Sequence, residues 1–279
     1  RSDRMPYIVV DAGHGGHDKG AHYHGYNEKD ITLTVATKVT ARLRELGFKV
    51  TQLRTDDTYV GNASARGREI AELQPNLAIS IHVNSAGGGG ESSGAEIYTP
   101  LKEDSARFEY YLKQELSRLN NFRAIYSKAY TGELYERFID PETLRYTQTY
   151  NYTDYYGIIR ESWRGGVSTD IIEMFYLDNE ADLYTFLNQE DAYVEAIVVS
   201  LCKAFNVDYE RGGLRTEESD LVKETKKETY YRVICGSYSS LNDAKQVQQN
   251  LVNQNYSGVW IQPVEMKRKI GRASCRERV

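Results

Sequence analysis

The sequence of 279 residues lacks the features that define several large classes of protein. It has no run of about 18 apolar residues, so we expect no transmembrane helix. Its 35 basic residues are outnumbered by 40 acidic ones, and a net charge of −5 argues against a nucleic-acid partner, which would call for a basic face. Hydrophobic residues make up 40% of the chain and charged residues 27%, as in globular proteins.

Cysteine is also scarce. The three cysteines, Cys202, Cys235 and Cys275, lie far apart and form neither a CxxC pair nor a disulfide framework. Cysteine usage therefore does not identify the compartment. Phenylalanine is sparse as well, with 7 residues against 23 tyrosines. Because tyrosine combines an apolar ring with a polar tip, this bias suits surfaces and grooves.

Apolar periodicity alternates between strand and helix through the first 209 residues. Short apolar runs predict strands, and i, i+4 repeats after capping residues predict helices. The expected strands are 7–10, 49–53, 77–82, 94–98 and 169–175, and the expected helices are 28–46, 63–73, 104–119 and 193–205. This alternation predicts an α/β fold with a mostly parallel sheet flanked by helices.

The composition changes after residue 209. Residues 210–228 are polar and charged and read as a linker. Residues 229–264 then predict a strand, a helix over 241–254 and a second strand, which is a partial small α/β module, too short for an independent core. Residues 265–279 form a basic tail without a hydrophobic period, which we expect to be disordered or non-native.

Three side chains are predicted to meet at one edge of the sheet. His14 follows the first strand in a glycine turn, Glu28 opens the next helix, and His82 ends a buried strand. Sites in open α/β sheets form at the carboxyl ends of strands. Two histidines and a carboxylate are a typical set of catalytic zinc ligands that leaves one position open. Glu173 is a fourth candidate, because a carboxylate in so apolar a strand needs a functional reason.

Each of these residues also has an ordinary interpretation. His14 could be a surface histidine, Glu28 a first-turn acid that favours the helix dipole, and Glu173 an edge residue facing water. Rival histidines are present in the same loop, at positions 17, 22 and 24. Asp11 could orient a metal ligand from behind or simply cap the turn.

Four ordered motifs in residues 6–206 resemble those of the zinc-dependent N-acetylmuramoyl-L-alanine amidases of the Amidase_3 type. They are Ile-Val-Val-Asp-Ala-Gly-His-Gly-Gly at 8–16, Glu-Lys-Asp at 28–30, Ser-Ile-His-Val-Asn at 80–84, and the segment 171–179. Arg54 and Arg66 also fit the pattern. The last motif departs from the family, because Met-Phe-Tyr stands at 174–176 where a glycine usually precedes the aromatic residue.

The resemblance implies the chemistry of each position. It makes His14, Glu28 and His82 ligands of a Zn²⁺ cofactor and Glu173 the catalytic acid–base. Separately from the resemblance, we expect Asp11 and Arg54 to support these ligands without contacting the metal. It implies a phosphorylase/hydrolase-like fold for residues 1–209, with no counterpart role for the histidines at 17, 22 and 24. The expected reaction is cleavage of the peptidoglycan amide between N-acetylmuramic acid and the L-alanine of the stem peptide.

A cell-wall role also fits the partial module over residues 229–264. Residues 231–238, followed by Ala244 and Leu251, resemble the first half of a SPOR domain, a family that binds glycan strands without stem peptides. We expect a periplasmic or secreted protein whose signal peptide has been removed. Two alternatives remain open: a non-catalytic wall-binding protein, and another zinc hydrolase on the same scaffold, such as a carboxypeptidase or deacetylase.

Residues 121–160 contain eight tyrosines and are expected to be irregular, except for a short helix over 134–139 that ends at Pro141. Three interpretations compete. The tyrosines could line a groove for the substrate, or the segment could be a packed loop. It could also be a lid over the zinc, as in division amidases of the family that an activator protein must open. A lid acid would then fill the open metal position; the candidates are Glu133, Glu136, Asp140 and Glu142.

Overall fold

The computed structural model describes residues 4–210 and, beyond them, residues 240, 243, 245–247 and 249–250. The chain divides into two units, Arg1–Val222 and Lys223–Val279, and the first is described here by itself. The predicted linker, partial module and tail lie almost entirely outside the described residues. Within the helix predicted over 241–254, the described residues between 243 and 250 are helical.

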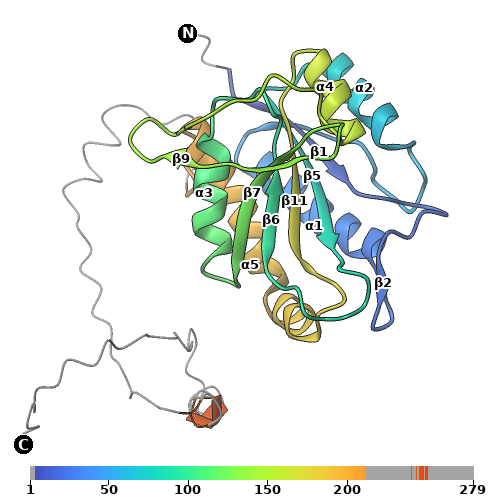
Figure 1. The fold of residues 1–279 in the computed structure, drawn as a ribbon, viewed down its shortest axis with the longest axis vertical. Helices are drawn as coiled ribbons and strands as arrows, with labels where there is room; N and C mark the ends of the chain where they lie inside the picture. Colours follow the sequence, from blue (N-terminus) through green and yellow to red (C-terminus); the bar gives the residue numbers. More distant parts are fainter. Residues whose placement is uncertain (1–3, 211–239, 241–242, 244, 248, 251–279) are drawn as a thin grey trace, which may run out of the picture. The chain divides into compact units, whose positions relative to one another are not determined.

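A seven-stranded sheet forms the centre of the first unit (Figure 1). Its strands, in spatial order, are β4 (Lys49–Gln52), β1 (Tyr7–Ala12), β5 (Leu77–Asn84), β11 (Thr169–Tyr176), β6 (Ala95–Tyr98), β7 (Phe122–Lys128) and β8 (Leu134–Glu136). The first four are mutually parallel. β6 runs antiparallel to β11 and parallel to β7, and β8 is antiparallel to β7. The predicted mostly parallel sheet is therefore confirmed.

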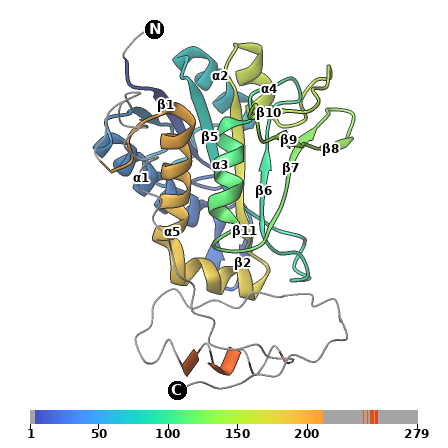
Figure 2. The ribbon, with the colours of Figure 1, turned by 90° about the vertical axis from the view of Figure 1, so that its left-hand side faces the viewer.

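Helices cover both faces of this sheet, as Figure 2 shows. On one face lie α1 (Glu28–Glu45), α3 (Arg107–Leu116) and α5 (Glu180–Phe205), and on the other α2 (Ala63–Leu73) and α4 (Gly157–Arg164). Alternation along β1 explains both layers, because Ile8 and Val10 pack toward α1 while Val9 packs toward α2. In the part of the chain that is described, no helix is long and apolar enough to span a bilayer.

Local sequence signals set most helix ends. Asn62 caps α2, since its side chain accepts a hydrogen bond from the amide of Ala65 at 2.9 Å. Gly47, with φ of +91°, follows α1 in the left-handed conformation that ends helices. The helix predicted from 104 begins only at Arg107. The reason is that backbone at 104–106 bonds to 144–146 instead.

The prediction that residues 121–160 are irregular is wrong. This segment contains β7, β8, a two-stranded pair made of β9 (Ile139–Asp140) and β10 (Arg145–Tyr146), and the start of α4. The helix predicted over 134–139 is also wrong, because Leu134 and Glu136 pair with β7. Leu134 and Phe138 would share one helix face but are 51% and 61% exposed, so this face has no core to pack against.

Two buried side chains hold the segment 129–154 to the rest of the unit. The guanidinium of Arg137, 4% exposed, donates to the carbonyls of Pro100 at 2.9 Å and Glu103 at 2.8 Å. The hydroxyl of Tyr146 donates to Glu109 Oε1 on α3 at 2.8 Å. These contacts favour the packed-loop interpretation of the segment.

Candidate functional site

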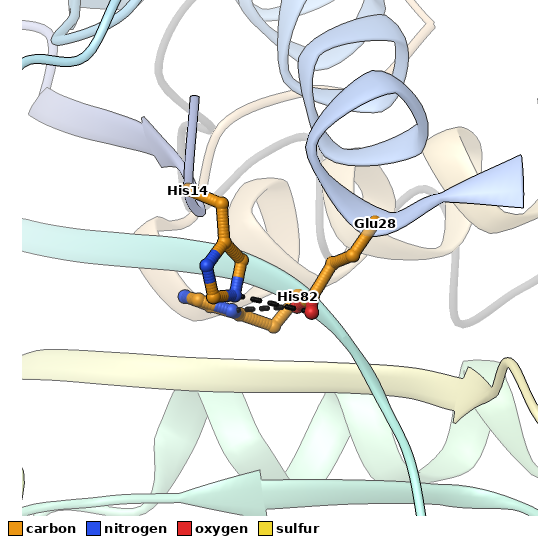
Figure 3. A group of neighbouring side chains, drawn as sticks. All are labelled: His14, Glu28 and His82. Atoms are coloured by element: carbon orange, nitrogen blue, oxygen red, sulfur yellow. Dashed lines mark hydrogen bonds and ion pairs between the residues drawn. The ribbon is translucent and has the colours of Figure 1, made fainter. Parts of the chain in front are cut away.

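The structure brings together the three residues predicted as metal ligands. His14 lies in the turn after β1, Glu28 is the first residue of α1, and His82 lies on β5 next to β1. Each offers one ligand atom, and these atoms all lie within 4.8 Å of one another (Figure 3). It is the only such group among the described residues.

The buried carboxylate of Glu28 lies between the two imidazoles. Its Oε1 is 2.9 Å from Nδ1 of His82, and its Oε2 is 3.1 Å from Nε2 of His14. The amides of Ala21 and Val83 also donate to it, at 2.8 and 3.2 Å. Although burial raises the pKa of Glu28, its hydrogen bonds to the two histidines lower it further, so the pKa falls well below its usual range. The carboxylate is therefore held in its charged form.

The same contacts act on the histidines. Burial lowers the pKa of both rings, but the hydrogen bond to Glu28 and its negative charge outweigh burial. The pKa of His14 is raised, and that of His82 is raised to about 9. A metal ion would take the place of the proton that the rings share with Glu28, because metal ligation needs neutral imidazole.

Two glycines leave the space that this cluster needs. A Cβ on Gly13 would overlap the ring of His82, and one on Gly20 would overlap the Glu28 carboxylate and the His14 ring. Gly20 also has a φ of +64°, which side chains with a Cβ rarely adopt. Gly13 of the first motif and Gly20 thus serve close packing of the ligands as well as the turn.

Each histidine is oriented by a second contact. Nδ1 of His14 is 2.9 Å from Asp18, four residues along the chain. Nε2 of His82 is 3.1 Å from the hydroxyl of Ser80, which donates to Asp11 Oδ2 at 2.6 Å. Asp11 is in turn paired with Arg66 of α2 at 2.7 Å. Such contacts fix the tautomer and direction of metal-ligating rings.

Asp11 therefore reaches a predicted ligand through Ser80, as one of the two open interpretations of it requires. Sequence reasoning missed both Ser80 and Asp18 as site residues. The available signals were their spacings, two residues before His82 and four residues after His14.

Arg54 supports the ligands indirectly. Its side chain is fully buried and donates to the carbonyls of Gly13 at 3.0 Å and Lys29 at 2.8 Å. It thereby joins the turn before His14 to the start of α1, where Glu28 lies. Its role is to hold two backbone segments in register, and it makes no direct contact with the three ligands among the described hydrogen bonds.

Glu173 lies beside the cluster on β11, paired in the sheet with His82. Burial raises its pKa to about 7, against the opposing charge of His82. Within the described part of the chain its Oε2 is buried without a hydrogen-bond partner. Burying a carboxylate without a hydrogen-bond partner costs free energy, and such groups often have a functional role.

The other candidates do not join the group. The ring of His17 packs on Tyr59 at 4.3 Å, His22 bonds to Asn27 at 2.7 Å, and His24 lies 3.8 Å from Glu180. The insert acids at 133, 136, 140 and 142 are likewise outside it. No acid of a lid thus reaches the ligands from the described residues.

A polar cavity of about 400 Å³ opens over the cluster. It is lined by the three candidate ligands and Glu173, by residues of the hairpin formed by β2 (His22–Tyr23) and β3 (Tyr26–Asn27), and by the end of β5. The lining includes no residue of 121–160. The cavity is large enough to admit an amide group and the first atoms on either side of it.

The donor set fits a divalent metal ion. Two imidazole nitrogens and one carboxylate oxygen converge from three separate segments, with Asp18 and Ser80 orienting the rings. Such a set leaves a coordination position open and suits zinc, and it also suits iron(II). The fold and this cluster together define an α/β scaffold with a candidate mononuclear metal centre at its strand ends.

Comparison with known proteins identifies the family. The family profile described as N-acetylmuramoyl-L-alanine amidase, Amidase_3, matches residues 8–206, and the chain therefore belongs to this family. It is 32% identical over 120 residues to the sporulation-specific N-acetylmuramoyl-L-alanine amidase of Bacillus subtilis, covering 42% of this chain and 46% of the relative. It is 42% identical over 91 residues to the uncharacterized protein YqiI of B. subtilis, covering 33% of this chain and 43% of YqiI.

These matches span less than half the length of either relative. Solved structures show the same fold over more of the chain. The catalytic domain of CwlV, an amidase from Bacillus (Paenibacillus) polymyxa var. colistinus, superposes with a TM-score of 0.56 at 24% identity, covering 73% of this chain and 100% of that one. The CwlD amidase of Clostridioides difficile, solved in complex with the GerS lipoprotein, gives 0.56 at 22% identity, covering 73% and 100%.

Proposed function

We propose that this protein is a zinc-dependent peptidoglycan hydrolase that cleaves the amide between N-acetylmuramic acid and the L-alanine of the stem peptide. Family membership supports the substrate and the bond. The observation that carries the chemistry is the convergence of His14, Glu28 and His82 beside the buried carboxylate of Glu173. We further propose that the protein acts outside the cytoplasm, in the periplasm or after secretion, where its substrate lies.

In this proposal three residues hold the metal. Zinc, when bound by His14, Glu28 and His82, would supply Lewis-acid chemistry, which makes water more acidic and polarises an amide carbonyl. The contacts of Asp18 and Ser80 hold the two rings in ligating orientation. Asp11, Arg66 and Arg54 stabilise the surrounding turn through the contacts described above.

Glu173 moves the proton. A pKa of about 7, raised mainly by burial, lets the carboxylate take a proton at neutral pH and give it back. Its Oε2 would accept a proton from the attacking water as the carbon–oxygen bond forms. The same oxygen would deliver that proton to the L-alanine nitrogen as the carbon–nitrogen bond breaks, which releases the amine and leaves the carboxylate unprotonated.

The alternatives make different products. Purified peptidoglycan is incubated with the protein, with and without a chelator, and the new chain ends are identified. We expect free L-alanine amino groups and whole stem peptides, released only without chelator. Shortened stems would indicate a carboxypeptidase, acetate a deacetylase, and binding without new ends a non-catalytic wall protein.

The proposal includes a protein partner but does not identify it. CwlD was solved together with a lipoprotein, and this chain shares its fold. The module predicted over 229–264 would add binding to glycan strands without stem peptides. Comparing wall binding by the full chain and by a chain ending at residue 228 tests this second role.

A further inference from the structure

On the face of the sheet that carries Glu173, two tyrosines continue away from the site. Glu173 pairs with Glu96 on β6, and two residues along the strand Ile171 pairs with Tyr98. Tyr98 in turn pairs with Tyr126 on the next strand, β7. Paired residues share one face of a sheet, and so do residues two apart in a strand. Tyr98 and Tyr126 therefore lie on the Glu173 face of the sheet. The strands that carry them, β6 and β7, are neighbours (Figure 1).

Two more rings extend this line to the start of α4. The ring of Tyr156, the residue that caps α4, meets Tyr98 edge to face with centroids 5.0 Å apart. Tyr155 follows at 5.3 Å from Tyr156, and on the other side Tyr126 lies 5.7 Å from Tyr98. The ammonium of Lys128 sits 4.0 Å above the Tyr155 ring. We call Tyr126, Tyr98, Tyr156 and Tyr155 the tyrosine row.

Tyr98 connects the row to the candidate catalytic carboxylate. Its strand partner Ile171 lies two residues before Glu173 on the same face of β11, and the ring of Tyr156 packs against Tyr98. None of the four rings lines the cavity over the ligands. Tyr155 is 45% exposed, and the other three are half-buried. The row thus lies outside the cavity, on the same face of the sheet as Glu173.

We propose that the tyrosine row is a binding site for the sugar rings of the glycan strand. This rests on the proposed function, because the scissile amide is attached to a sugar that must leave the cavity in some direction. Tyrosine faces pack against the apolar C–H faces of a sugar, and their hydroxyls meet its polar edge. The row places four tyrosine rings in succession, each of them at least partly exposed, as a polymer of linked sugars requires.

A peptide fits this surface less well. An extended peptide would bind by adding a strand to a free sheet edge, but β8 already covers β7 along Tyr126–Lys128. The hydroxyl of Tyr98 already donates to Glu96 Oε2 at 3.1 Å, so its ring is what remains for a ligand. The cavity lining, which includes His22, Tyr23 and Ser85, is left for the stem peptide.

The first test needs no catalysis. The full chain is titrated with chitotetraose, a β-1,4-linked N-acetylglucosamine tetramer, and binding is followed by NMR at the amides of residues 126 and 156. We expect Tyr126→Ala and Tyr155→Ala each to weaken this binding about tenfold, as loss of an aromatic anchor does. Tyr126→Phe keeps the ring face and should bind nearly as well as wild type. Tyr184→Ala removes an exposed tyrosine of α5 that lies outside the row, and as the matched control it should change nothing.

Site-resolved signals separate the row from any binding by residues 229–264, which all variants share. Wild-type signals at 126 and 156 that do not respond to the saccharide would overturn the proposal. So would equal binding by Tyr126→Ala and Tyr184→Ala. Titration with a stem tripeptide covers the alternative, and a stronger response to it at the same amides would assign the row to peptide.

A second test uses cleavage. The two alanine variants should raise KM about tenfold on polymeric peptidoglycan but leave the rate on a single N-acetylmuramoyl-tripeptide unchanged. Equal losses on both substrates would assign the tyrosines to stability instead. If wild type cleaves neither substrate, the proposed function fails, while the saccharide titration still decides on the row.

Discussion

The ligand cluster and the segment 121–160 are built on the same sheet but are encoded differently. Each predicted ligand comes with a short motif, and each histidine has an orienting contact that is close in sequence: His14 with Asp18, and His82 with Ser80. The segment is held by contacts between distant residues. Arg137 bonds to Pro100 and Tyr146 to Glu109, each 37 positions away.

This difference predicts how substitutions in the two regions will act. Parallel strands bring their carboxyl ends to one edge whatever the loops contain, so the cluster depends on the order of strands. The segment lies where β6, β7 and β8 extend the sheet beyond β11, and it contributes no residue to the cavity over the cluster. We therefore expect substitutions in the cluster to remove chemistry and substitutions in the segment to change stability or binding.

The largest effect is expected from His82→Ala. It removes the imidazole that lies between Glu28 and Ser80, and so removes one of the three proposed metal ligands. Outer contacts of a metal site are worth about 10- to 100-fold in affinity, so loss of a ligand should exceed about 100-fold. Metal analysis should find about one zinc per wild-type chain and almost none in the variant.

His22→Ala is the matched control, since His22 lines the same cavity but lies outside the cluster. It should keep its zinc. Full metal retention in both His82→Ala and His14→Ala would refute the ligand assignment, and iron in place of zinc would refute the proposed cofactor.

Glu173→Gln should have the next largest effect. The amide keeps the shape of the side chain but cannot take a proton, so kcat on peptidoglycan should fall at least about 100-fold with the zinc content unchanged. Glu136→Gln, an exposed acid on β8, is the control and should be as active as wild type. Near-normal turnover by Glu173→Gln would mean that another carboxylate moves the proton.

The sequence was sufficient for the parts of the fold that rest on local signals. Apolar runs and caps predicted the four parallel strands, the helices α1, α2 and α3, and the second half of α5, which begins at Glu180 and not at 193. The positions of His14, Glu28 and His82 at strand and helix ends predicted that their side chains meet. These predictions succeeded because strand order and helix packing leave few alternatives. Glu173 was predicted because a carboxylate in so apolar a strand needs a reason, and the structure places it next to His82 in the sheet with its Oε2 buried. Its catalytic role stays a prediction.

The parts of the fold that the sequence did not predict depend on pairing between distant residues. The i, i+4 repeat of Leu134 and Phe138 favours a helix. In the structure, however, residues 134–136 form backbone hydrogen bonds with β7, which a helix over these residues could not make. Local propensity cannot anticipate this competition, because the partner strand is itself a short, weakly patterned run. The short helix α4 was missed for a related reason: it begins at Gly157 and has only two turns in which to show a period.

The smallest effect on activity should come from Glu109, whose buried carboxyl anchors the segment through Tyr146 and whose substitution should change stability instead. Burial raises its pKa to about 7, so the folded protein holds a proton that the unfolded chain releases near pH 4.5. Its stabilising contribution is complete below about pH 4.5 and is lost as pH rises through about 7, a change of ~3 kcal/mol at 1.36 per unit. Glu109→Gln should flatten this fall in the free energy of unfolding, measured by denaturant titration from pH 5 to 8.

The neighbouring Asp170 also has a pKa that burial raises, so part of the pH dependence should remain in Glu109→Gln. Glu133→Gln, on the exposed part of the segment, should keep the wild-type slope. If Glu109→Gln also keeps it, the proton is not held at this carboxyl, and the segment is anchored by Arg137 and backbone contacts instead.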